Sequence, residues 1–264
     1  MLEVKNLSVS YFSDDQVIKA VDAVSFKVET GSILGIVGES GSGKSTIAQA
    51  IMRLIAPPGK ITGGEIIFDG QDLLELAEKE MIGVRGARIS MIFQDPFTSL
   101  NPVITLGEQI AEAIRLHQGL NNQDAWAAAV RMLEAVHIKQ AAKRARDYPH
   151  QFSGGMRQRA MIAMALSCRP EILIADEPTT ALDATIQAEI IRLLKEVQAE
   201  FNLSVIYITH NFGIIKAFCR DVIVIEKGRV AEAGPVDQLL TRPQSPYTQR
   251  LLNALKILSE RNHG

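Results

Sequence analysis

The first part of the chain alternates apolar and polar residues, which is the pattern of strands with one buried face. The alternation covers residues 2–9 and 20–28, and the turn-forming residues 13–15 separate the two stretches. A third stretch of the same kind covers 64–68. We therefore expect an antiparallel β subdomain near the start of the chain.

Further along, apolar runs without alternation are separated by helical patterns. The expected strands are 33–37, 88–93, 171–175 and 204–209, and the expected helices are 45–54, 156–167, 184–201 and 212–218. Such runs between helices are typical of parallel strands covered on both faces. From about residue 107 to 146 the pattern is helical and rich in alanine, which indicates a helical insertion. The last ~20 residues, with Pro243 and Pro246, have no clear pattern.

Composition limits the classes of protein to which this chain can belong. The chain has 264 residues, 47% of them hydrophobic, and a net charge of −2, which suits a folded protein with a sizeable core. No apolar run approaches the ~18–20 residues of a membrane span, and the first residues lack a signal-peptide pattern, so we expect the chain to stay in the cytoplasm. The net charge argues against a nucleic-acid binder. Cys168 and Cys219 form no C-x-x-C pair, so we interpret both as reduced packing residues.

A glycine-rich stretch follows the run 33–37 and leads into an expected helix. It has the spacing G-x-x-x-x-G-K-S, and its members are Gly38, Ser40, Gly41, Ser42, Gly43, Lys44, Ser45 and Thr46. Glycines in such a turn let backbone N–H groups converge on phosphate oxygens, and the helix N-terminus adds partial positive charge. Lys44 would reach the β- and γ-phosphates, and the Ser45 hydroxyl would bind the Mg²⁺ that bridges them. The stretch predicts a nucleoside triphosphate; the alternative is a Gly/Ser-rich turn that happens to end in lysine.

Polar side chains follow two of the expected buried strands. Asp176 and Glu177 come after 171–175, and His210 comes after 204–209. The carboxyl ends of parallel strands meet at the edge where the phosphate loop also lies. Asp176 can hold Mg²⁺, and Glu177 can accept a proton from the water that attacks the γ-phosphate. A neutral His210 could contact that phosphate or orient the water, although such residues at strand ends also occur in ordinary turns.

A second glycine loop precedes the expected helix 156–167. Ser153, Gly154 and Gly155 repeat the order of hydroxyl, glycines and helix start, so they form a second candidate anion site. One nucleotide does not need two such loops from one subunit, which indicates that this loop serves a nucleotide bound to a partner. The alternative is an ordinary helix start whose methionines face the core.

In combination these motifs resemble the ATP-binding cassette (ABC) family, and the resemblance covers nearly the whole chain. The residues that carry it are the phosphate loop, Gln94, the signature Phe152-Ser153-Gly154-Gly155-Met156, the pair Asp176 and Glu177, the stretch Ala181-Leu182-Asp183, and His210. The signature departs from the commoner L-S-G-G-Q at both ends. It keeps Ser153 and Gly155, which supply the phosphate contacts in the family.

The resemblance implies an ATPase with ATP and Mg²⁺ as ligands. Its catalytic residues would be Glu177, His210, Gln94 and Lys44, and its metal ligands would be Ser45, Gln94 and Asp176. Gln94 would also contact the attacking water and link to a transmembrane subunit. Tyr11 would stack on adenine, with Phe12 as a competing choice. Two ATP molecules would lie between opposed phosphate and signature loops of two subunits, where Asp183 would also contact nucleotide.

The resemblance also implies an α/β fold: a P-loop NTPase core with a mainly parallel sheet, an antiparallel β subdomain and an α-helical subdomain. The chain, 1–264, would be a single nucleotide-binding domain. Its helical subdomain would cover about 95–167 and its C-terminal extension about 235–264.

Longer stretches resemble one branch, the importers of dipeptides, oligopeptides and nickel. They are 93–102, 148–159, 176–183 and Ser245-Pro246-Tyr247-Thr248. The branch implies an ATPase subunit that powers peptide uptake through two membrane permease subunits, beside a second homologous or identical ATPase. An extracytoplasmic solute-binding protein would act indirectly, and the chain would lie peripherally on the cytoplasmic face of the plasma membrane. The alternatives are a nickel or metal-chelate importer, a soluble ABC protein acting on ribosomes or DNA, and a non-hydrolysing regulatory subunit.

Overall fold

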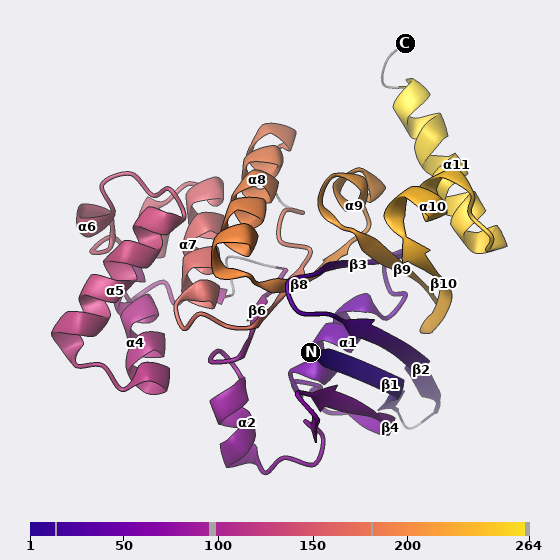
Figure 1. Ribbon diagram of the computed structural model, residues 1–264, viewed down its shortest axis with the longest axis horizontal. Helices are drawn as coiled ribbons and strands as arrows, with labels where there is room; N and C mark the ends of the chain where they lie inside the picture. The colour runs from indigo at the N-terminus through magenta and orange to yellow at the C-terminus, as the bar shows by residue number, and fades with distance from the viewer. Residues whose placement is uncertain (14, 95–98, 181, 262–264) are drawn as a thin grey trace. The chain divides into compact units, whose positions relative to one another are not determined.

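The structure, a computed structural model, describes residues 1–13, 15–94, 99–180 and 182–261, with side chains up to residue 254 (Figure 1). Contacts between residues divide the chain into two compact units. Unit 1 consists of Met1–Leu76 and Ile206–Gly264, and unit 2 consists of Ala77–Val205.

One sheet of unit 1 is antiparallel. Its strands, in order across the sheet, are β2 (Val17–Val28), β1 (Leu2–Phe12), β4 (Gly59–Phe68) and β5 (Gln71–Asp72). On the central strand β1, Val4 lies opposite Phe26 of β2 and Ile66 of β4, and all three side chains are buried. The alternation of apolar and polar residues thus places one face of the sheet against the core, as predicted.

A second set of strands in unit 1 leads into the glycine-rich loop. In order, these strands are β10 (Arg229–Pro235), β9 (Asp221–Glu226), β3 (Ile33–Val37) and β8 (Ser204–Thr209), whose first two residues belong to unit 2. β3 runs parallel to β9, with Ile36 opposite Ile223, whereas β9 and β10 are antiparallel. β8 is buried along its whole length, which explains its continuous apolar run.

Helices cover these strands of unit 1. They are α1 (Lys44–Ile51), α9 (Phe212–Phe218), α10 (Val236–Thr241) and α11 (Pro246–Arg261). One apolar cluster joins α9, α10 and α11 to β3 and β9, and its members are Val37, Phe212, Ile215, Val222, Val224, Val236, Leu239 and Tyr247. α9 approaches β3 closely at Gly35, where a Cβ atom would lie 2.6 Å from Ile215 Cδ1 and 3.1 Å from Cys219 Sγ. Glycine at position 35 therefore sets the spacing of this helix from the strand.

Unit 2 combines a pair of parallel strands with several helices. β6 (Ile89–Ile92) pairs with β7 (Ile172–Asp176), and every residue of both strands is buried. The helices are α2 (Glu78–Val84), α4 (Leu106–Gln118), α5 (Asn122–Ala135), α6 (Ala141–Arg144), α7 (Gly154–Leu166) and α8 (Ala184–Phe201), with a 3₁₀ turn η1 at Pro149–Gln151. α4 packs against α5, and α7 contacts both, so these helices form one group in Figure 1.

The α/β fold class is confirmed, and the predicted helical region 107–146 corresponds to α4, α5 and α6. The sequence prediction omitted α2, the hairpin of β9 and β10, and the helices α10 and α11. It also started β4 at residue 64, whereas the strand begins at Gly59. The proposed boundaries of the helical subdomain and C-terminal extension stay a prediction.

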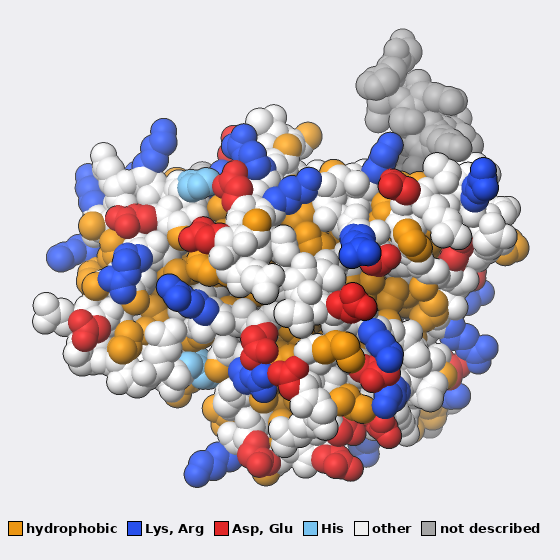
Figure 2. All heavy atoms as spheres, viewed as in Figure 1, with side chains coloured by type: hydrophobic (Ala, Val, Ile, Leu, Met, Phe, Trp, Pro, Cys, Tyr) orange, Lys and Arg blue, Asp and Glu red, His pale blue; other side chains and the backbone are white. Residues whose placement is uncertain are grey.

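The surface and the helices add two observations. On the face shown in Figure 2, acidic and basic side chains are interspersed, as the small net charge suggests. Within the residues that the structure describes, no helix has both the length and the apolar character needed to cross a bilayer.

Candidate functional site

The glycine-rich loop connects β3 to α1, and its geometry depends on a glycine at the start of the helix. Gly43 caps α1 with a φ of 106°, and a Cβ atom there would lie 2.3 Å from the carbonyl oxygen of Ala20. Any other residue would therefore both strain the backbone and clash. Ser40 and Gly41 are exposed in the loop, and Ser45 and Thr46 are half-buried in the first turn of α1. That turn contains no acidic residue, which leaves the positive end of the helix suited to an anion.

Lys44 turns its side chain back over this loop. The residue is 5% exposed, and its ammonium group donates to the carbonyl oxygens of Gly38 at 3.0 Å and Glu39 at 2.8 Å. Both acceptors are neutral carbonyl oxygens, and the two bonds orient the ammonium group. The Ser42 hydroxyl of the same loop is buried and has no hydrogen-bond partner among the described residues. An oriented cation and a buried hydroxyl that lacks a partner fit the needs of phosphate oxygens.

In unit 2, the two carboxylates lie at and just after the end of β7. Asp176 is 4% exposed and Glu177 is 8% exposed. Glu177 has a φ of 45°, in the left-handed region that residues other than glycine rarely adopt. Such strained residues are concentrated at functional sites.

The Glu177 carboxylate receives two hydrogen bonds on one oxygen. The Thr180 hydroxyl donates to Oε2 at 2.7 Å, and the Gln94 amide donates to the same atom at 3.3 Å. The structure thus brings together the expected base and the expected water-orienting amide. The sequence did not indicate a role for Thr180, because the order of residues does not show that the turn after β7 brings this hydroxyl back to Glu177.

Ser153 and Asp183 each cap a helix of unit 2. Ser153 Oγ accepts from the Met156 N–H at the start of α7, and Asp183 Oδ1 accepts from the Ile186 N–H at 3.0 Å at the start of α8. Ser153, Gly154 and Asp183 are nevertheless exposed. The adjoining Ala181 lies outside the described residues.

The signature loop has both of the properties that the sequence offered as alternatives. Phe152 is 3% exposed and Met161 is also buried, so part of this stretch packs in the core. Gly155 is half-buried, whereas the Ser153 and Gly154 edge faces outward. An exposed loop on a buried anchor can present its hydroxyl and N–H groups to a second molecule.

The remaining candidates, His210 and Tyr11, belong to unit 1. His210 is exposed directly after β8, where the Asn211 N–H donates to Thr209 Oγ1 at 3.0 Å in the following turn. Tyr11 is half-buried near the end of β1. Phe12 is 40% exposed, with the Lys60 ammonium group 5.9 Å from its ring centroid. The choice between Tyr11 and Phe12 as the residue that contacts adenine therefore stays open.

Comparison with known proteins decides the family. A family model described as ABC transporter matches residues 21–180. The chain belongs to the ABC transporter family. The matched residues include the phosphate loop, Gln94, the signature and the two carboxylates, whereas Tyr11, Asp183 and His210 lie outside the matched range.

Relatives in this family match almost the whole chain. The oligopeptide transport ATP-binding protein OppD of Haemophilus influenzae is 51% identical over 258 residues, covering 98% of this chain and 80% of that protein. The glutathione import ATP-binding protein GsiA of Escherichia coli K12 is 50% identical over 98% of this chain and 42% of its own length. Among solved structures, the dimeric ABC cassette MJ0796 bound to ADP and Pi has a TM-score of 0.79 and 30% identity, and the match covers 89% of this chain and 99% of that one.

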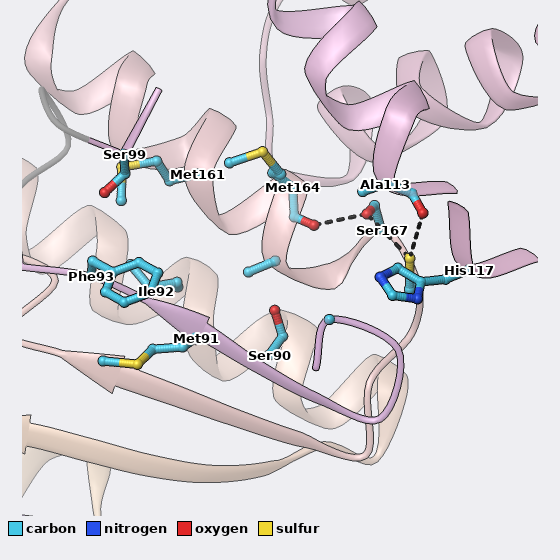
Figure 3. A pocket seen from close by; sticks show the side chains of 13 residues that line it. Ser90, Met91, Ile92, Phe93, Ser99, Ala113, His117, Met161, Met164 and Ser167 are labelled. Carbon is cyan, nitrogen blue, oxygen red and sulfur yellow. Dashed lines mark hydrogen bonds between the residues drawn. The ribbon is translucent and has the colours of Figure 1, made fainter. Parts of the chain in front are cut away.

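This ABC transporter subunit also has a cavity of about 550 Å³ within unit 2, beside the end of β6 (Figure 3). Its lining includes Met91, Ile92, Phe93, His117, Met161, Met164 and Cys168. Figure 3 shows Phe93 and Met161 on one side of the cavity and His117 on the other. The Cys168 thiol donates to the Ala113 carbonyl at 3.5 Å, and burial raises its pKa. The protonated thiol packs in this lining, in line with the role expected for it.

Proposed function

We propose that this chain binds and hydrolyses ATP as a subunit of an ABC importer of oligopeptides. The observation that carries the proposal is sequence identity. The chain is about 50% identical to OppD proteins over nearly its whole length, including 51% to the Haemophilus influenzae protein. The intact set of motif residues agrees with an active ATPase rather than a non-hydrolysing regulatory subunit.

We assign the substrate contacts to the phosphate loop. The loop N–H groups and the Ser42 hydroxyl would bind phosphate oxygens, and Lys44 would pair with the β- and γ-phosphates. We assign Ser45, Gln94 and Asp176 as ligands of Mg²⁺, which when bound neutralises phosphate charge. Tyr11 remains our candidate for stacking on adenine.

For hydrolysis we assign the base role to Glu177. Its carboxylate would accept a proton from the attacking water, and Gln94, which donates to Glu177 Oε2 at 3.3 Å, would orient that water. His210 would contact the γ-phosphate from its position after β8. Most of the rate enhancement would come from positioning and from charge stabilisation, because phosphoryl transfer needs little covalent chemistry from the protein.

The family works with partner subunits, and we propose their identities. The exposed Ser153 and Gly154 would contact ATP held by a second, homologous ABC ATPase, and Asp183 would lie at the same interface. The related cassette MJ0796 is a dimer in its structure with ADP and Pi. Two permease subunits would transmit the motion, with contacts at Gln94 and the residues after it, of which 95–98 lie outside the described part. The complex would lie on the cytoplasmic face of the membrane and would receive cargo from a solute-binding protein.

Peptide cargo is favoured over nickel because the similar proteins named above carry oligopeptides or glutathione by name. The cassette itself does not contact the cargo, so the choice needs a functional assay. The experiment is to purify the chain with its membrane partners, place the complex in lipid and measure ATP hydrolysis. Solute-binding protein would be added with a peptide mixture in one arm and with a nickel chelate in the other.

Stimulation by peptides alone is the expected result. Stimulation by the nickel chelate alone would overturn the peptide assignment and keep the importer. Recovery of the chain without any membrane partner would count against the importer itself and favour a soluble ABC protein.

A further inference from the structure

The stretch Ser245-Pro246-Tyr247-Thr248 has no role in the mechanism above, yet its last two residues are buried in unit 1. Tyr247 is 6% exposed at the start of α11, and its ring belongs to the apolar cluster that also contains Val37. Val37 is the last residue of β3, directly before the phosphate loop. The tyrosine ring therefore belongs to the same apolar cluster as the residue that directly precedes the loop.

The Tyr247 hydroxyl reaches the loop backbone. It accepts a hydrogen bond from the Glu39 N–H at 3.3 Å. The carbonyl oxygen of the same peptide group, that of Gly38, accepts from the Lys44 ammonium group at 3.0 Å. One peptide plane is thus held at its N–H end by Tyr247 and at its C=O end by Lys44. Rotation of this plane would break both bonds, so the hydroxyl fixes the acceptor that orients the lysine.

Other contacts hold Tyr247 in place. The Glu232 carboxylate of β10 accepts from the Gln244 N–H at 2.9 Å and the Ser245 N–H at 3.0 Å, which anchors the chain just before α11. The Ser245 hydroxyl accepts from the Tyr247 N–H at 3.2 Å. On the other side, the Arg250 guanidinium lies 5.8 Å from the tyrosine ring centroid and donates to Glu226 at 3.4 Å. The segment is therefore attached to both strands of the β9–β10 hairpin.

We infer that Tyr247 is a positioning residue for ATP binding: its hydroxyl fixes the Gly38–Glu39 peptide and thereby the phosphate loop and Lys44. Docking of the C-terminal segment onto β10 then sets the affinity of the loop for nucleotide. Only the expected effect on nucleotide affinity rests on the proposed ATPase function, because the hydrogen bond between Tyr247 and Glu39 is present in the protein without ligand.

The test uses Tyr247→Phe, which removes the hydroxyl and keeps the ring in the cluster. The matched control is Tyr207→Phe, because Tyr207 is also a buried tyrosine of unit 1, stacked edge-on against Phe218 at 5.2 Å. Amide hydrogen exchange of the peptide that covers the loop is measured first, without nucleotide. Loss of one hydrogen-bond acceptor should speed exchange at Glu39 about three- to tenfold in Tyr247→Phe and leave it unchanged in the control.

ATP affinity and turnover are measured next. Tyr247→Phe should raise the Kd and the KM for ATP about three- to tenfold and leave kcat within about twofold, because the loop is loosened but no reacting group is removed. Glu232→Ala should weaken ATP binding in the wild-type background and have no further effect in Tyr247→Phe, because both changes act through one contact.

The outcomes separate the two proposals. Unchanged loop exchange and unchanged ATP affinity in Tyr247→Phe would overturn the inference, as would equal affinity losses in Tyr207→Phe. If the effects of Glu232→Ala and Tyr247→Phe on ATP affinity are additive, the C-terminal segment does not act through the hydrogen bond between Tyr247 and Glu39, and that part of the inference is overturned. Faster loop exchange in a protein that fails to bind ATP would support the contact and contradict the proposed ATPase.

Discussion

Glu177 has a backbone conformation that its side chain disfavours, with φ at 45°. Strain of this kind costs of order 1–3 kcal/mol and persists only where the surrounding structure enforces it. Here the Thr180 hydroxyl and the Gln94 amide both bind the carboxylate. The residue is therefore held in one orientation, as a base that must meet a water molecule requires.

The first prediction follows from this geometry. Glu177→Gln keeps the size of the side chain and an oxygen that can accept from Thr180, but it removes the proton acceptor. We expect ATP affinity to stay within about twofold and hydrolysis to fall by about 10²–10⁴. The nucleotide-bound dimer should accumulate, which size-exclusion chromatography with ATP would detect.

The control for that variant is Glu171→Gln, the same change just before the start of β7. Glu171 is half exposed and pairs with Arg88 at 2.6 Å, and exposed pairs of this kind contribute little. Its turnover should match the wild type. Normal hydrolysis in Glu177→Gln would show that another group is the base.

At this scale the sequence predicts which residues belong to the site but not how they are held. Gln94 and Glu177 were expected near one water molecule, and the structure places them in contact. Thr180 and Tyr247 were not expected. The role of Thr180 depends on the left-handed turn at Glu177, and the role of Tyr247 depends on a contact between residues distant in sequence.

Among the helices, α7 and α8 have one feature in common: the residue that caps each helix is also one that we propose to contact nucleotide at the dimer interface. Ser153 starts α7 and Asp183 starts α8, each accepting from a backbone N–H three residues later. The cap fixes the side chain near the helix N-terminus, where the partial positive charge also lies. Helix stability and the proposed partner contact would therefore depend on the same oxygen atoms.

The second prediction separates these two roles at Asp183. Asp183→Ala should lower the free energy of unfolding by about 1 kcal/mol, because the Ile186 N–H loses its acceptor. Asp183→Asn should keep the stability, since asparagine caps about as well, while it removes the charge from the proposed dimer interface. Urea unfolding of the isolated chain measures the first effect, and ATP-dependent dimerisation measures the second. Equal stability losses in both variants would contradict the capping role.

The helices and strands show where the sequence is informative. The expected bounds of α8, β8 and α9 coincide with the observed ones. α8 is a long periodic helix, β8 has an apolar run at 205–208, and the short helix α9 follows the capping residue Asn211. The hairpin of β9 and β10 was missed. Its turn is Lys227-Gly228, both with positive φ, and lysine is not the usual residue there. β10 is also largely exposed, so it lacks an apolar alternation.

For the whole molecule, the Cys219 thiol, which is partly buried against the apolar cluster of unit 1, links stability to pH. Burial raises the pKa of this thiol from 9.0 to about 12. The folded protein therefore keeps the proton at a pH where the unfolded chain releases it. Stability from this residue is complete below the ordinary thiol pKa and is lost as the pH rises toward 12.

The third prediction compares the wild type with Cys219→Ala. Between about pH 8 and about pH 10 the wild type should lose about 1 kcal/mol more of its free energy of unfolding than the variant does. Denaturant unfolding at the two pH values measures this difference. Cys168 is present in both proteins, so its titration cancels. Equal losses in the two proteins would show that the Cys219 thiol titrates normally.

The close approach at Gly35 has a consequence for the history of this protein. Position 35 lies against Ile215 and Cys219, so the three positions share one small volume. A descendant that acquires alanine at 35 gains a methyl group 2.6 Å from Ile215 Cδ1, so the end of that side chain must shift, and a smaller residue at 215 or 219 would relieve the contact. Larger residues at position 35 should therefore occur together with smaller residues at 215 or 219.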